Sequence, residues 1–357
     1  MPTASEIAIA RQVPLSMGLL MALLLETPFL SAMDCRTTAG IKFLSLGIVS
    51  LPASSFANLG EGFINSEGQL ELREFSCSLI GGLIKAELIS AALWDKANAA
   101  AGESWLDLQT RLKFAADGLN IEKQLFYGTA NDPKGFPGFK EMTPHIPGNI
   151  LAMTDAVDKY SFRASVVDAG GTTANTASSV LSIRFGEMDA QLILGNDSGG
   201  ELVQIGQPFP QMIAPDSNAP TKLLQHVVQQ LQGFIGLSVA GFNPQQQGQT
   251  VPAQYSVRRL ANCTGDTGDG VTDAKMTKLT LSHGPGKRPS LLVMSARSGE
   301  QLAASRAPTA VNFVMGQSGD ASKATYTTYP PPPENWQGIP IAYPHPNSLG
   351  NSDAIEV

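Results

Sequence analysis

One long amphipathic helix is the feature that most constrains this fold. Ser104 is followed three residues later by Asp107, the spacing of a capping box, in which side chains satisfy backbone amides at a helix start. Apolar residues then recur mostly three or four positions apart up to Phe126, with a gap near Glu122. This pattern predicts one helix of about 22 residues, about 33 Å long. Its apolar stripe is typical of core packing and indicates no cofactor site. The stripe consists of Trp105, Leu108, Leu112, Ala115, Leu119 and Phe126.

The segments around this helix predict strands, turns and a shorter helix. Two strand-like runs, 41–49 and 70–80, flank a polar tip and predict a long hairpin. From Gly82 onward the pattern predicts a helix. After the long helix, the glycines and prolines of 127–139 predict a compact loop.

The second half of the chain is mixed in character. Short apolar runs at 180–185, 190–195 and 290–294 predict strands, and two stretches, 223–233 and 245–249, are rich in Gln. No repeat of fixed period is present in the sequence. The whole pattern predicts an α+β protein.

The charge content is unusually low. Only 15% of the 357 residues are charged, against about 25% in an average soluble protein. A subunit that hides much of its surface against copies of itself is one explanation of such a composition. The net charge of -7 argues against direct binding of nucleic acid, which needs clustered Lys and Arg.

The cysteines and the N-terminus bear on the compartment. Cys35, Cys77 and Cys263 form no CxxC pair, and their spacing to the histidines is not that of metal ligands. They are expected to be free thiols of a protein made in a reducing cytoplasm. The apolar segment 12–25 after Arg11 imitates a secretory leader but is too short for a membrane span of about 20 residues.

One short motif imitates a serine hydrolase. Asn196–Gly200 resembles the sequence around a chymotrypsin-type nucleophile, which would be Ser198. That chemistry needs a histidine base and an orienting aspartate earlier in the chain. His145 is the one earlier histidine and lies between prolines, so we expect a turn and no catalysis.

Three further motifs imitate ion or phosphate sites. Asp266, Asp269 and Asp273 lie in a Gly- and Asp-rich loop, but its spacing is wrong for calcium and the terminal Glu is missing. Gly286-Lys287 lacks the other residues of a phosphate loop. The four histidines are scattered, and a patch of Lys287, Arg288 and Arg297 is too small for a nucleic-acid site. We therefore expect no catalytic, cofactor-binding or metal-binding residues.

Five stretches in a fixed order resemble a known family. First, a long helix ends in an aromatic-Tyr-Gly turn that is followed by a Phe-x-Gly element. Next, a Gly-Gly-Thr stretch leads into a strand that ends in aromatic-Gly. The remaining three are a Tyr-x-Val-Arg-x-x-Asn segment, a strand with a short helix, and a Gly-x-Pro-Ile terminus with late acidic residues. These stretches are Leu125–Gly128 with Phe136–Phe139, Asp168–Gly186, Tyr255–Asn262, Ser290–Arg306, and Gly338–Ile341 with Asp353 and Glu356. Together they resemble major capsid proteins of tailed double-stranded DNA phages with the Hong Kong 97 fold, particularly the epsilon15-like podovirus subgroup.

The resemblance implies a division of the chain. It implies an N-terminal arm (1–35), an extended loop (36–80), a peripheral domain with the spine helix (81–150), an axial domain (151–330) and a C-terminal return to the peripheral domain (331–357). Some such shells crosslink themselves through a Lys on the extended loop. The tip from Ser50 to Gln69 contains no Lys, so we expect no crosslinking of that kind.

The resemblance also implies a function. The chain is expected to form pentamers and hexamers of an icosahedral virion shell, to be made in the host bacterial cytoplasm, and to enclose double-stranded DNA without sequence-specific binding. Scaffold, portal and decoration proteins are candidate partners, and neither an enzymatic activity, nor a cofactor, nor a membrane is expected. The alternatives are a secreted hydrolase-like protein using Ser198 and an encapsulin-like cellular compartment shell.

Overall fold

The protein forms two compact units, each built from segments that are distant in sequence. The computed structural model describes residues 27–50, 52–97, 104–155, 164–195, 204–213, 224–241, 256–265, 268–284, 286–306 and 332–356. The first unit is formed by the described residues within 27–45, 72–138 and 191–238, and the second by those within 46–71, 139–190 and 239–356.

The first unit is a six-stranded sheet organised by one long strand, β11 (Leu224–Ser238). β4 (Ser78–Glu87) runs antiparallel to it from the pair His226–Glu87 to the pair Ile235–Ser78. The other strands of this sheet are β1 (Cys35–Thr37), β8 (Gln191–Leu194), β9 (Gln204–Ile205) and β10 (Phe209–Ile213). β8, β9 and β10 all pair with β11, and β1 pairs parallel with β8.

The helix expected from Gly82 is wrong in its first part. Residues up to Glu87 continue strand β4, and only Leu88–Ala97 are helical, as α4. The burial pattern explains this: Ile84 and Ala86 are buried, whereas Leu83 and Lys85 between them are exposed. A period of two indicates a strand, and pairing with β11 overrides the helical preference of Leu, Lys and Ala.

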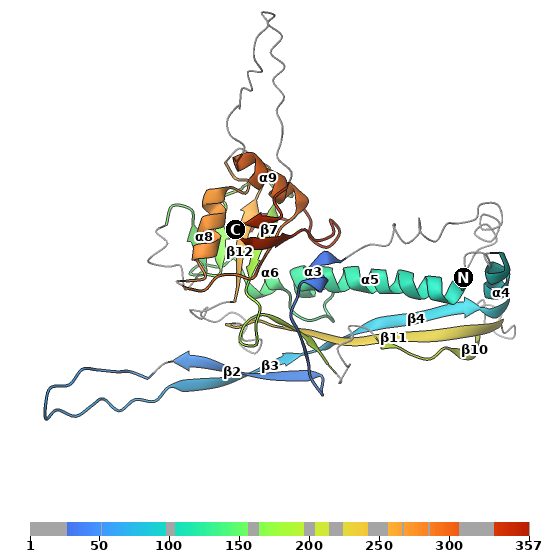
Figure 1. Cartoon of the computed structure of the whole chain (residues 1–357), viewed down its shortest axis with the longest axis horizontal. Helices are drawn as coiled ribbons and strands as arrows, with labels where there is room; N and C mark the ends of the chain where they lie inside the picture. The colour runs from blue at the N-terminus through green and yellow to red at the C-terminus, as the bar shows by residue number, and fades with distance from the viewer. Residues whose placement is uncertain are drawn as a thin grey trace, which may run out of the picture. The chain divides into compact units, whose positions relative to one another are not determined.

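The long helix is confirmed as α5 (Trp105–Tyr127), which lies along β4 in Figure 1. The Ser104 hydroxyl accepts a hydrogen bond from the Asp107 backbone amide at 3.2 Å, as the capping signal predicts. The expected stripe is correct at both ends of the helix but wrong at Leu112, which is 41% exposed. The short helix α3 (Pro28–Ser31) adds Phe29, whose ring lies 5.0 Å from that of Phe126.

The compact loop after α5 is also confirmed. It begins with a 3-10 turn, η2 (Gly128–Ala130). The Gln124 side-chain amide donates to the Phe136 carbonyl at 2.7 Å and to the Asp132 carbonyl at 3.3 Å, so one buried side chain ties two points of the loop to the helix. Gly138 packs so closely that an added Cβ would lie 2.4 Å from the backbone nitrogen of Gly128.

The second unit contains a seven-stranded mixed sheet whose order is β14-β15-β13-β7-β12-β6-β5. Its core is lined by Leu, Val and Met side chains together with Trp336. The strands are β5 (Ile150–Ala152), β6 (Val166–Asp168), β7 (Ser178–Ile183), β12 (Val257–Cys263), β13 (Leu291–Val293), β14 (Asn335–Trp336) and β15 (Ile339–Ala342). The helices are α6 (Phe139–Met142), α8 (Asp273–Leu281) and α9 (Ala296–Arg306).

The two units divide the chain differently from the five predicted segments. Residues 191–238 fall within the predicted axial segment 151–330, yet they join α5 in the first unit because β11 pairs with β4. The C-terminal segment was expected to return to the domain with the spine helix. In the structure, β15 of this segment pairs with β13 in the second unit.

The predicted hairpin is present and is formed by β2 (Lys42–Ser50) and β3 (Gln69–Ser76). The Lys42 ammonium pairs with the Glu74 carboxylate at 2.5 Å near its base. Residues 52–68 join the two strands without regular structure except for a turn near Gly60. The N-terminal arm expected at 1–35 lies outside the described residues up to position 26.

We predict that Gly138→Ala destabilises dispersed subunits by about 1–3 kcal/mol, because the new methyl group meets backbone atoms that cannot rotate away. Gly62→Ala is the matched control, since an added Cβ there meets nothing within 4 Å. Urea unfolding of both variants measures the difference. Equal midpoints for the two would contradict the packing described for this loop.

Candidate functional site

The hairpin of residues 42–76 carries apolar side chains that the described residues leave uncovered. Phe56 and Leu59 are fully exposed and Phe63 is 82% exposed. Other exposed apolar residues of the hairpin are Leu44, Leu46, Ile64, Leu70 and Leu72. A two-stranded hairpin is marginally stable alone, and contiguous exposed apolar surface marks an interaction site. The hairpin is therefore the candidate interaction surface of the described residues.

The tip of the hairpin has a fixed turn. The Glu61 amide donates to the Asn58 carbonyl at 3.0 Å, and the Asn58 amide donates to the Glu61 carboxylate at 2.9 Å. These hydrogen bonds lower the pKa of Glu61 below its ordinary value. Gly60 has a φ of +96°, which suits glycine. The turn thus presents Leu59 on a defined backbone.

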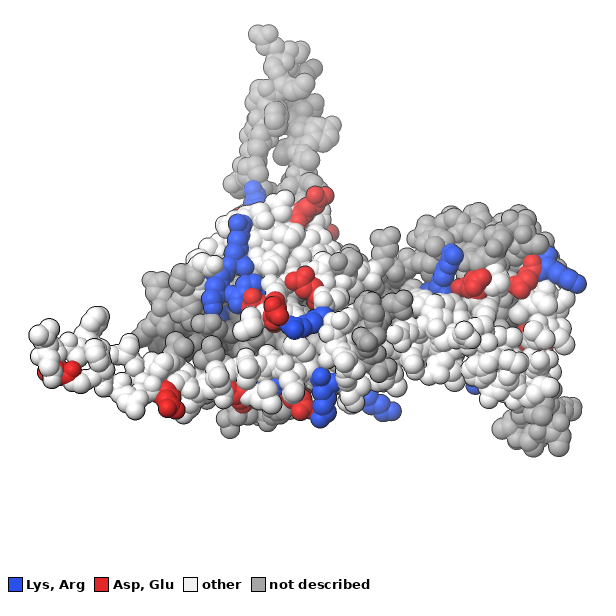
Figure 2. All heavy atoms as spheres, turned by 60° about the horizontal axis from the view of Figure 1, so that its bottom comes forward, with Lys and Arg blue, Asp and Glu red and all other residues white. Residues whose placement is uncertain are grey.

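The tip has a polar and weakly acidic sequence from which a few apolar side chains project. Between residues 52 and 68 its charged side chains are Glu61 and Glu67, with no Lys or Arg. Figure 2 accordingly shows few coloured side chains over the hairpin. A partner surface for this tip needs apolar hollows and, at most, isolated positive charge.

The sheet of the first unit offers a second exposed apolar surface. In an antiparallel pair, directly opposed residues share a face, so Leu79 and Leu83 of β4 lie with Phe234 and Gln230 of β11 on one face. Leu79 is 65% exposed and Leu83 is 55% exposed. The opposite face carries Gln229, whose side-chain oxygen accepts from the Thr110 hydroxyl of α5 at 3.1 Å. The helix thus covers one face of the sheet. On the other face Leu79 and Leu83 are exposed, whereas Val228 and His226 farther along β11 are buried.

A buried ion pair fixes the C-terminal tail within the second unit. The Arg259 side chain on β12 is 1% exposed, and its two terminal nitrogens bind the two carboxylate oxygens of Glu356 at 2.7 and 2.5 Å. The same guanidinium donates to the Thr143 carbonyl at 2.8 Å and hydroxyl at 3.1 Å. A buried charge with this many partners is satisfied and rigid.

Further polar groups surround this pair. The Lys140 ammonium lies 3.1 Å from Glu356 and 3.3 Å from Asp353. The Asn262 side chain donates to the Glu356 carbonyl at 2.9 Å and accepts from its amide at 3.0 Å. Burial raises the pKa of Glu356, but the hydrogen bonds and charges of Arg259 and Lys140 outweigh it and lower that pKa below its ordinary value. The resemblance had singled out Asp353 and Glu356 without a role, and the structure makes them anchors of the tail.

The loop that imitates a calcium site contains a cation of the chain itself. The buried Lys275 ammonium on α8 binds the Gly268 carbonyl at 2.7 Å and the Gly270 carbonyl at 3.0 Å. Burial lowers the pKa of Lys275. Asp273 is also engaged, since its carboxylate accepts from Arg306 and from the Trp336 indole at 2.8 and 2.9 Å. Asp266 lies outside the described residues.

The hydrolase motif finds no support in the described residues. Ser198 lies outside them. His145, the predicted poor base, lies in the second unit with its ring 3.8 Å from the Asp168 carboxylate, and neither ring nitrogen makes a hydrogen bond. Asp168 in turn accepts from the Asn262 side chain at 3.1 Å, so it belongs to the network around the tail.

The other histidines have structural settings. His283 is buried, and its Nε2 lies 2.8 Å from the Ser182 hydroxyl. Burial, then the charges of Arg258 and Arg184, lower the pKa of His283 to about 3. His226 is buried on β11 with its Nδ1 3.0 Å from the Leu224 carbonyl, and the His345 Nδ1 accepts from the Asn347 amide at 3.1 Å.

The basic residues and the thiols are not gathered into sites either. Arg297 donates to the Thr176 carbonyl at 2.6 Å and to the Asn351 carbonyl at 3.2 Å, which ties it to the tail. The backbone amide of Lys287 donates a hydrogen bond to the Gly284 carbonyl. All three cysteines are free thiols, and burial raises the pKa of Cys263 to about 12.

The described residues contain no group of three or more His, Cys, Asp or Glu side chains that would hold a metal ion. Among the same residues, no helix is both long and apolar enough to span a membrane.

Comparison with known proteins gives a structural answer. No family model and no curated protein matches this sequence. A chain of the bacteriophage epsilon15 structure matches with a TM-score of 0.54 and 15% identity, over 91% of this chain and 88% of that chain. A chain of the bacteriophage JBD30 capsid matches with a TM-score of 0.41 and 11% identity, over 82% and 86%. A chain from Mycobacterium phage Adephagia matches with a TM-score of 0.43 and 10% identity, over 72% and 97%.

The epsilon15 match spans nearly the whole of both chains. The present chain therefore has the Hong Kong 97-type capsid fold, as the ordered resemblances in its sequence predict. The fold gives no support to the hydrolase alternative.

We predict that Glu356→Gln destabilises the subunit by about 3–5 kcal/mol, because Arg259 is left as a buried charge without its counter-ion. Glu334→Gln is the control, since Glu334 is exposed. The wild-type pair contributes to the free energy of unfolding at pH values above 4.5, the ordinary pKa of a glutamate. This contribution is lost as the pH falls through the lowered pKa that Glu356 has in the folded state. Denaturant unfolding of dispersed subunits at neutral and acidic pH tests both statements, and a neutral-pH change no larger than the control's would refute the first.

His283 makes a separate acid-dependent contribution. Its pKa is about 3 in the folded subunit against 6.5 when exposed, so the unfolded chain binds more protons between these values. Stability should therefore fall as the pH drops from 6.5 toward 3. His283→Gln should flatten this part of the profile, as measured by the unfolding midpoint at a series of pH values. An unchanged slope would show that His283 is not the group responsible.

Proposed function

We propose that this chain is the major capsid protein of a tailed double-stranded DNA phage and acts by self-assembly into a closed shell. The observation that carries the proposal is the exposed apolar hairpin on a chain with the Hong Kong 97-type capsid fold. Copies of the same chain, in rings of five and six, supply the cover that one subunit lacks. The low charge content agrees with a surface that is largely buried between copies.

The two units take different parts in this proposal. The first, with α5 lying on its sheet, is the peripheral domain, and the second, with its buried polar network, is the axial domain that meets its copies at the ring centre. The hairpin is the extended loop that reaches a neighbouring subunit. Its strand edges and apolar tip are the surfaces on which that contact depends.

The proposal extends to partners and location. The shell encloses double-stranded DNA by confinement, since a net charge of -7 gives the chain no general affinity for phosphate. Scaffold, portal and decoration proteins are the expected assembly partners, and synthesis takes place in the cytoplasm of a host bacterium. The chain itself has no catalytic role.

Purified protein tests the proposal directly. Sedimentation and negative-stain electron microscopy should show rings or closed particles of very high mass. A species that stays monomeric over the whole accessible concentration range, with and without co-expressed neighbouring genes, would overturn the proposal. Shells that enclose an enzyme in place of DNA would favour the cellular-compartment alternative.

We predict that replacing Phe56, Leu59 and Phe63 together by Ser suppresses assembly while leaving subunit stability within about 0.5 kcal/mol of wild type, because these side chains are exposed before assembly. Sedimentation measures assembly, and urea unfolding of dispersed subunits measures stability. The matched control replaces the exposed polar residues Ser54, Ser55 and Asn65 by Ala. Normal particle yield from the apolar triple variant would show that the hairpin tip is dispensable.

A further inference from the structure

A pocket in the first unit has the size and chemistry to receive an apolar side chain. It lies between α5, the start of β4, the end of β11 and the loop after α5, and has a volume of about 130 Å³. Its apolar wall is formed by Ile80, Ile121, Phe136 and Ile235. A cavity of about 150 Å³ with a similar lining takes up benzene, so this one accommodates the side chain of a leucine.

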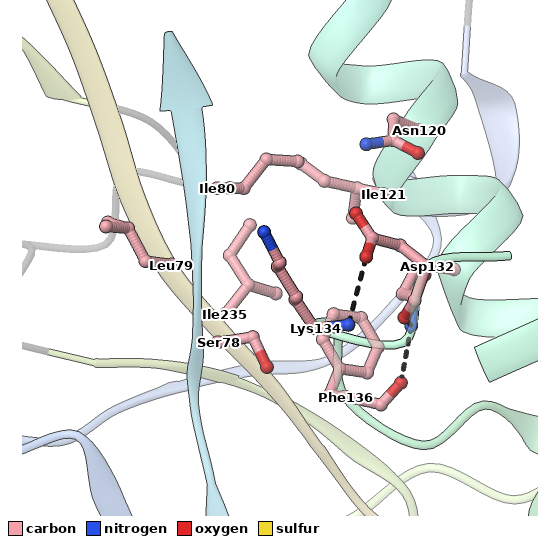
Figure 3. A pocket seen from close by; sticks show the side chains of 11 residues that line it. Ser78, Leu79, Ile80, Asn120, Ile121, Asp132, Lys134, Phe136 and Ile235 are labelled. Carbon is pink, nitrogen blue, oxygen red and sulfur yellow. Dashed lines mark hydrogen bonds between the residues drawn. The ribbon is translucent and has the colours of Figure 1, made fainter. Parts of the chain in front are cut away.

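One positive charge stands at this pocket. Figure 3 shows the Lys134 side chain extending into the pocket past Phe136, with Asp132 beside the base of the loop. The Asp132 carboxylate is engaged with the backbone amide of Lys134 at 2.9 Å. Among the described residues, the Lys134 ammonium itself makes neither an ion pair nor a hydrogen bond. The pocket therefore combines an apolar wall with the Lys134 ammonium. The polar side chains of Ser78, Asn120 and Gln124 and the engaged carboxylate of Asp132 complete its lining.

The hairpin tip has the complementary pattern on a single turn. Leu59 is fully exposed, and Glu61 stands two residues later in the turn held by Asn58. One carboxylate oxygen of Glu61 accepts the hydrogen bond from the Asn58 amide, and the other oxygen can accept a further partner. An exposed leucine beside a negative charge matches a leucine-sized hollow beside a positive one.

We propose that the pocket receives Leu59 from the hairpin tip of a second copy of this chain, with Glu61 of that copy paired to Lys134. This inference rests on the proposed self-assembly and makes it specific, because it assigns the anchoring residue and the receiving site. The turn is formed before docking, so little conformational entropy is lost on binding. The ion pair lies at the rim and sets the orientation of the tip in the pocket.

Zero-length crosslinking of the wild-type protein tests the contact. Particles are assembled from isotopically light and heavy subunits and treated with a carbodiimide, which joins a carboxylate to an amine in direct contact. Mass spectrometry should find Glu61 joined to Lys134 in mixed light–heavy pairs. Particles that form but join Glu61 only to other lysines overturn the pocket assignment while leaving the proposed function intact, whereas absence of particles counts against the proposed function itself.

Charge reversal gives an independent test. Glu61→Lys and Lys134→Glu should each slow particle formation about tenfold by placing like charges at the contact, and the double variant should recover to within about twofold of wild type. Glu67→Lys is the matched control, since Glu67 is the other acid of the tip. Urea unfolding of each dispersed variant identifies any loss of stability. Slowing without recovery in a stably folded double variant, or equal slowing by the control, would overturn the proposal.

Discussion

The antiparallel pairing of β11 with β4 is the interaction on which the first unit depends. β11 also pairs with β8, β9 and β10, and α5 lies against β4. The two strands come from widely separated parts of the chain, and the chain between them includes Phe139–Ala190 of the second unit. The pairing therefore closes a long loop of the chain, which costs conformational entropy. The hydrogen bonds between the strands and the contacts with the helix must offset this cost. Such non-local pairing is associated with slow folding.

Local signals in the sequence predict the elements whose causes are local. The Ser104 cap, the compact loop around Gly128–Gly138 and the strand at 290–294 follow from neighbouring residues, and all three are present. The short helix after that strand was expected only from the resemblance to capsid proteins, and it is present as α9. β11 was not predicted as a strand, because its Gln residues blur the apolar alternation and only its partners make it a strand. The prediction of a helix for Gly82–Glu87 is wrong for the same reason. Residues with helical preference form a strand there because they pair with β11.

The candidate sites divide in the same way. The hairpin and its tip were predictable from two strand-like runs around a polar stretch, and the absence of Lys from the tip is read directly from the sequence. The anchoring of Glu356 by Arg259 does not, because the two residues lie far apart and the partner of a late acidic residue cannot be read from its neighbours. The pocket is likewise assembled from three separate segments. The ordered resemblance to capsid proteins predicted the fold where local sequence signals did not.

The lysine in the Asp-rich loop has a consequence for how this part of the second unit responds to its surroundings. A free metal ion occupies a site in proportion to its concentration, and chelation empties the site. The Lys275 ammonium is covalently attached to the helix beside the loop, so its effective concentration at the Gly268 and Gly270 carbonyls is fixed by the fold. The Gly268 and Gly270 carbonyls thus receive their positive charge from the chain itself.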